Sequence, residues 1–64
     1  MVTKTCMMNC LTQHSVPLVY RNTIADEAVK ATSASALVAA LRAKGIPQTW
    51  IDIGVQCYYQ CGGT

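Results

Sequence analysis

Two pairs of cysteines lie near the two ends of this chain, and they constrain its fold more than any other feature. Cys6 and Cys10 lie near the N-terminus of the 64 residues, and Cys57 and Cys61 lie near the C-terminus. A core this small contributes little net stability, so short chains usually need staples. An even number of cysteines in a short chain is typical of disulfides formed in an oxidising compartment. The sequence therefore predicts one disulfide-stapled domain, residues 1–64.

The spacing within each pair is C-x3-C, which puts both cysteines of a pair on one side of a helix. We expect helices over residues 4–14 and 48–61, joined by two bridges, with Gly62 as the cap of the second. The twin C-x3-C layout resembles that of plant α-hairpinins and small mitochondrial intermembrane-space chaperones. In those proteins the two pairs lie far closer together in the sequence. The resemblance covers the four cysteines alone, and we infer no family from it.

Between the cysteine pairs, residues 23–44 are predicted to form one long helix. Thr23 is a good N-cap residue, Gly45 suits the position after a helix end, and Pro47 forbids continuation. Ala36 and Ala40 fall on a small-sided face that we expect a neighbouring helix to cover. Residues 15–22 are expected to form an extended connector, because Pro17 and the β-branched valines disfavour a regular helix. No internal repeat is evident beyond the cysteine pairs. The predicted fold is an all-α bundle of three helices, short, long and medium, with disulfides between the first and third.

Two disulfide pairings fit such a bundle. Parallel first and third helices would join Cys6 to Cys57 and Cys10 to Cys61, whereas antiparallel ones would give the nested bridges Cys6–Cys61 and Cys10–Cys57. The nested pairing needs the connector to cover about 25 Å, and eight extended residues reach at most about 26–29 Å. The apolar, glycine-free connector suits a straight path, so we prefer the nested pairing.

The residues offer little for catalysis. His14 is the only histidine, and no two of the three acidic residues are spaced for acid–base chemistry. We therefore expect no enzyme, no cofactor and no catalytic residue, and we assign no metal ligand. A metal or redox centre of four thiolates is kept as an alternative. The net charge of +2 is too small for a nucleic-acid reader, which would carry a basic stripe.

Three aromatic residues are candidates for binding: Trp50, Tyr58 and Tyr59. Trp50 is expected to lie in the core, and at least one of the adjacent tyrosines is expected to be exposed. The predicted function is a secreted, mildly cationic helical peptide of the bacteriocin, toxin or antimicrobial kind, binding a membrane surface or a receptor. The alternatives are an intracellular four-cysteine metal or redox module and a helical protein-interaction module. The first residues lead into no apolar run typical of a signal peptide, so the expectation of secretion depends on the cysteines.

Overall fold

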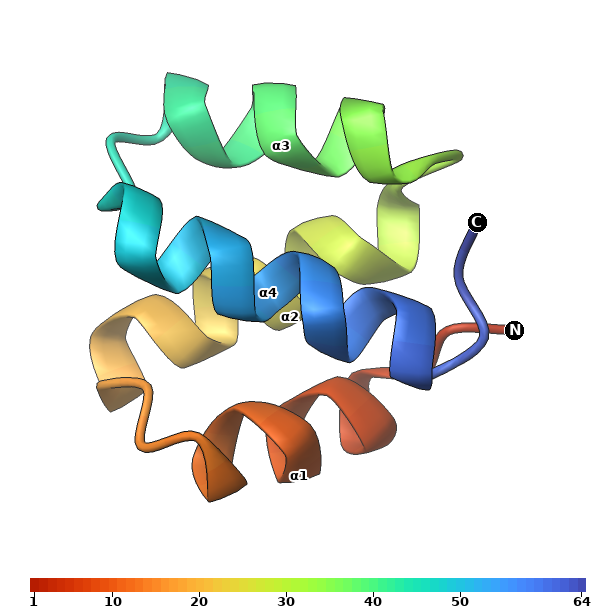
Figure 1. Cartoon of the computed structure of the whole chain (residues 1–64), viewed down its shortest axis with the longest axis horizontal. Helices are drawn as coiled ribbons and strands as arrows, with labels where there is room; N and C mark the ends of the chain where they lie inside the picture. The colour runs from red at the N-terminus through yellow and green to blue at the C-terminus, as the bar shows by residue number, and fades with distance from the viewer.

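The computed structural model describes residues 1–64 and contains four helices and no strands (Figure 1). They are α1 (Lys4–Gln13), α2 (Leu18–Lys30), α3 (Ala34–Ala43) and α4 (Gln48–Gln60). The predicted all-α class is confirmed, and the predicted number of three helices is wrong. Helices α1 and α3 each pack against both α2 and α4 but do not contact one another. The pair α2 and α4 therefore forms the centre of the molecule.

The predicted long helix over residues 23–44 is divided into two. The backbone becomes extended at Ala31, and Ser33 begins α3 by accepting a hydrogen bond from Ala36 N at 3.1 Å. A continuous helix of this length would span about 33 Å, whereas the longest extent of the molecule is 24 Å. The break lets α3 fold back, so that Leu37 and Leu41 become fully buried. Burying each of these leucine side chains contributes roughly 1.5–3 kcal/mol to folding. This contribution favours the broken helix over a continuous one.

The predicted extended connector over residues 15–22 is also wrong. Only residues 14–17 connect the helices, and Pro17 stands at the start of α2. Proline is tolerated there because the first residues of a helix have no intrahelical acceptor for their N–H groups. The carbonyl of Pro17 accepts hydrogen bonds from Tyr20 and Arg21, which close the first turn of α2.

The four helices form two copies of one helical hairpin. Helix α3 begins 30 residues after α1 (34 against 4), and α4 begins 30 residues after α2 (48 against 18), with equal lengths in each pair. At this offset the residues are identical only at Leu11/Leu41 and Pro17/Pro47. Buried apolar residues nevertheless recur in pairs, namely Met7/Leu37, Leu11/Leu41 and Val16/Ile46. The expectation that the chain has no internal repeat is therefore wrong.

The turns of the two hairpins share the same hydrogen bonds. Val16 N donates to Leu11 O, and Ile46 N donates to Leu41 O, both at 3.1 Å. Ser15 and Gly45 occupy the left-handed position between them, with φ of 61° and 74°. This is the Schellman arrangement, which satisfies the last carbonyls of a helix. Both turns lie at the same end of the molecule, opposite the chain termini (Figure 1). We call residues 14–19 and 44–49 the turn end.

Candidate functional site

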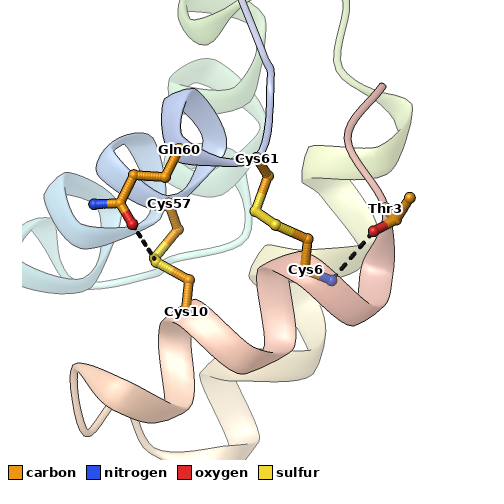
Figure 2. The surroundings of a disulfide bond; sticks show 6 residues. All are labelled: Thr3, Cys6, Cys10, Cys57, Gln60 and Cys61. Carbon is orange, nitrogen blue, oxygen red and sulfur yellow. Dashed lines mark hydrogen bonds between the residues drawn. A yellow bond between two sulfur atoms is a disulfide. The ribbon is translucent and has the colours of Figure 1, made fainter.

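Two disulfides fasten α1 to α4 (Figure 2). Cys6 pairs with Cys61 and Cys10 pairs with Cys57, with Cα–Cα distances of 5.9 and 5.7 Å. The nested pairing is confirmed, although the reason that we gave for it is not. Two hairpins in succession make α1 and α4 antiparallel, and no long straight connector is needed. Paired cysteines in so small a chain are typical of an oxidising, extracellular environment.

The two bridges differ in their surroundings. Cys10 and Cys57 are buried, whereas Cys6 is partly exposed. Gln60 Oε1 lies 3.4 Å from Cys10 Sγ (Figure 2). A disulfide sulfur carries no proton, so this approach becomes a hydrogen bond only when Cys10 is a thiol. The Cys6–Cys61 bridge is thus the more accessible of the two to a reductant.

His14 lies one helical turn beyond Cys10. It ends α1, and its backbone N–H donates to Cys10 O at 3.2 Å. Its side chain is exposed, but one ring nitrogen and the sulfur atoms of Cys10 and Cys57 all lie within 4.8 Å of one another. The i, i+4 spacing of Cys10 and His14 predicts that His14 lies along the cysteine side of the first helix, with Gln13 as the alternative, and the structure puts His14 beside the buried bridge.

The three aromatic candidates occupy different environments. Tyr58 is only 2% exposed, and its hydroxyl donates a long hydrogen bond of 3.4 Å to Ala31 O. Trp50 is partly buried and packs against the core. Tyr59 is 54% exposed, and its ring meets that of Tyr58 edge to face. Tyr58 helps to fix the break between α2 and α3, so of the three side chains Tyr59 is the one most open to a partner.

The acidic residues form surface contacts. Lys4 Nζ lies 2.9 Å from Asp26, and Asp52 accepts a hydrogen bond from Gln48 at 2.8 Å. Glu27 is the least exposed carboxylate, with 14% of its side chain accessible, and it pairs with Lys30 and Lys44. Exposed ion pairs of this kind each contribute about 0–1 kcal/mol to folding. Asp26 and Glu27 therefore join α2 to α1 and to the end of α3 at the surface, whereas the contact of Asp52 lies within α4.

A groove of about 190 Å³ lies between α2 and α3. It is lined by Glu27, Lys30, Ala31, Thr32, Ala36 and Ala40. In the hairpin repeat, Ala36 and Ala40 correspond to Cys6 and Cys10, while Glu27 and Ala31 correspond to Cys57 and Cys61. The groove thus occupies the place in one half of the molecule that the disulfides fill in the other. The expectation that a neighbouring helix covers this alanine face is wrong, because Ala36 is exposed.

The turn end combines exposed apolar side chains with an absence of acidic residues. Leu18 is 59% exposed and Val19 is 73% exposed, and residues 14–19 and 44–49 include no Asp or Glu. Helices α2 and α4 both begin here, with no side-chain cap and no acidic residue in the first turn. Helices α1 and α3 end here as well, so the partial positive charge of each helix N-terminus lies beside the partial negative charge of a helix C-terminus. None of the helices combines the length and hydropathy needed to span a bilayer.

No family model, no curated protein and no solved structure matches this chain. The geometry described above is therefore the only basis for assigning a function.

Proposed function

We propose that this protein is a secreted, disulfide-stapled helical peptide of the bacteriocin or toxin kind, which acts by binding an anionic membrane surface through its turn end. The observation that carries the proposal is the exposure of Leu18 and Val19 at the turn end, where Asp52 accepts a hydrogen bond from Gln48 but residues 14–19 and 44–49 themselves include no acidic side chain. Exposed aliphatic side chains cost free energy in water, and burying them in a headgroup region recovers about 25 cal/mol for each Å².

Charge supports an anionic target. The net charge of the chain is +2, and the turn end has one lysine, Lys44, which also pairs with Glu27, and no acidic residue among its own positions. A cationic surface beside apolar side chains is the combination by which interfacial helices bind acidic lipids. Two disulfides fit an extracellular setting, in which such a peptide would meet a target membrane.

Vesicle binding tests the proposal. We expect the oxidised protein to bind phosphatidylglycerol-containing vesicles more tightly than pure phosphatidylcholine vesicles, with affinity falling as salt rises, because salt screens the charge contribution. The hairpin repeat supplies a matched variant: Leu18→Gln with Val19→Thr copies the residues at positions 48 and 49 of the second hairpin. This variant should keep the fold and lose most of the vesicle binding.

Tyr59→Gln serves as the comparison, since Tyr59 is exposed but lies at the far end of α4 from the turn end. Equal loss of binding from both variants would show that the turn end is not the contact surface. No binding to either vesicle type would overturn the membrane proposal and favour a protein receptor, with the groove between α2 and α3 as the next surface to test.

A further inference from the structure

His14 and the buried bridge suggest chemistry that is separate from membrane binding. Metal ligands in proteins are most often thiolates, imidazoles and carboxylates, and Zn²⁺ takes them in a tetrahedral arrangement. Cys10, Cys57 and His14 bring two sulfurs and one ring nitrogen within 4.8 Å of one another. In the oxidised protein the two sulfurs are bonded to each other, so they are not available as thiolate ligands.

We propose that, when its disulfides are reduced, this protein binds one Zn²⁺ through Cys10, Cys57 and His14, with the metal joining α1 to α4 in place of the buried bridge. A dithiol can supply the reduction: it donates two electrons and two protons to the Cys10–Cys57 bond, which breaks to two thiols, while the dithiol closes to a cyclic disulfide. Zn²⁺ then displaces the two thiol protons and binds two thiolates and a neutral imidazole nitrogen. A fourth position remains for water.

The distances fit this site. With Zn–S of about 2.3 Å and Zn–N of about 2.0–2.1 Å, ligand atoms around a tetrahedral ion lie roughly 3.5–3.8 Å apart. Once the bridge is broken, the two sulfurs must move apart from bonding distance to this spacing, and the ring nitrogen, now within 4.8 Å of both, must approach by about 1 Å. The histidine is exposed and ends its helix, so its side chain has room to turn toward the sulfurs. In the oxidised protein the two Cα atoms are 5.7 Å apart across the bridge, and in the reduced chain the metal would have to restore this approach of α1 to α4.

The proposed site of Cys10, Cys57 and His14 differs from a site made of all four cysteines. Cys6 lies one turn before Cys10 along α1 and pairs with Cys61, whereas His14 lies one turn after Cys10. The ligand atoms that lie within 4.8 Å of one another include that of His14 and not those of Cys6 and Cys61, so we assign a mixed sulfur–nitrogen centre.

The variant Cys6→Ser with Cys61→Ser isolates the three ligands. After reduction with a phosphine under argon, it should take up one equivalent of Co²⁺, with the visible bands of tetrahedral Co²⁺ and thiolate charge-transfer absorption. Zn²⁺ should displace the Co²⁺ and raise the helical circular dichroism of the reduced chain. Adding His14→Ala should weaken Co²⁺ binding by roughly tenfold or more, since even supporting groups around a metal contribute that much.

Lys44→Ala is the matched control, because Lys44 occupies the position of His14 in the second hairpin, and it should leave Co²⁺ binding unchanged. Equal Co²⁺ affinity with and without His14→Ala would overturn the assignment of His14. Tetrahedral bands that require Cys6 and Cys61 would show a tetrathiolate site instead. Absence of tetrahedral bands in both the variant and the reduced native chain would overturn the metal site altogether. Vesicle binding by the oxidised protein does not bear on any of these outcomes.

Discussion

Gly54 of α4 packs directly against Ile24 of α2, its counterpart in the other hairpin. A Cβ atom at position 54 would lie 2.9 Å from Ile24 Cγ2 and 3.6 Å from Leu41 Cδ1. The central helices can cross this closely only because one member of the pair has no side chain. Glycine inside a helix ordinarily costs about 0.5–1 kcal/mol relative to alanine, so close packing here outweighs helix propensity.

Gly54→Ala should therefore destabilise the protein despite its better propensity. The β-branched Ile24 is stiff and cannot move its methyl group aside, and overpacking of this kind costs about 1–3 kcal/mol. Urea unfolding of the oxidised protein, followed by circular dichroism, measures the change. Ile24→Leu removes the opposing β-methyl, so the double variant should lose less stability than the sum of the two single variants. Simple additivity would mean that these residues do not meet.

Ser15 and Gly45 provide a second matched pair, because both have positive φ. The left-handed conformation costs an L-residue roughly 1–2 kcal/mol, and glycine adopts it freely. We expect Ser15→Gly to leave stability unchanged or raise it by up to about 1 kcal/mol, and Gly45→Ser to lower it by about 1 kcal/mol. Thermal unfolding of the two oxidised variants measures both effects. A loss of stability from Ser15→Gly would show that the first turn does not adopt this conformation.

The alanine faces of α2 and α3 should differ in their tolerance of larger side chains. Ala28 is buried at 1% exposure, so Ala28→Leu should cost about 1–3 kcal/mol by overpacking. Ala36 is exposed beside the groove, so Ala36→Leu should change the free energy of unfolding by no more than about 0.5 kcal/mol. Urea unfolding compares the two variants: when the m-value is unchanged, a shift in the denaturant midpoint reports the change in the free energy of unfolding. An equal penalty at both positions would mean that the groove is closed in solution.

The disulfides should dominate stability. Each bridge closes a loop of about fifty residues, with sequence separations of 55 and 47, and a native disulfide contributes about 2–4 kcal/mol. In a domain with so small a core, metal-free reduction should unfold the helices near 37 °C. The comparison is the same protein heated without reductant. Helical circular dichroism that survives reduction at 37 °C would show that packing alone maintains the fold.

The sequence predicts the helical class and two bridges between the end helices, because i, i+4 cysteines and alanine-rich segments are local signals, but both pairings fit the cysteine spacing and the nested choice depended on a connector that the structure lacks. It does not predict the break at residues 31–33. Ser33 caps α3, but a serine within an alanine-rich run looks the same whether it caps a helix or lies inside one. Thr23 resembles an N-cap residue yet lies within α2. These choices are decided by burial of Leu37 and Leu41, which is a tertiary effect.

The repeat escapes sequence inspection for a related reason. Only Leu11/Leu41 and Pro17/Pro47 are identical, and the remaining agreement lies in burial and turn geometry. A leucine followed five and six residues later by a β-branched residue and proline occurs in both halves, and it is the signal that could have revealed the hairpin. The sequence does not predict the turn end either, since Leu18 and Val19 fall within the predicted extended connector, residues 15–22.

Disulfide mapping of the native protein tests the central structural claim, that two antiparallel hairpins are closed by nested bridges. Cyanogen bromide cleaves after Met7 and Met8, which separates Cys6 from Cys10, and chymotrypsin cleaves after Tyr58 and Tyr59, which separates Cys57 from Cys61. Mass spectrometry of the unreduced fragments should show one peptide pair joining Cys6 to Cys61 and another joining Cys10 to Cys57. A fragment that joins Cys6 to Cys57 would make α1 and α4 parallel and would contradict the two-hairpin fold.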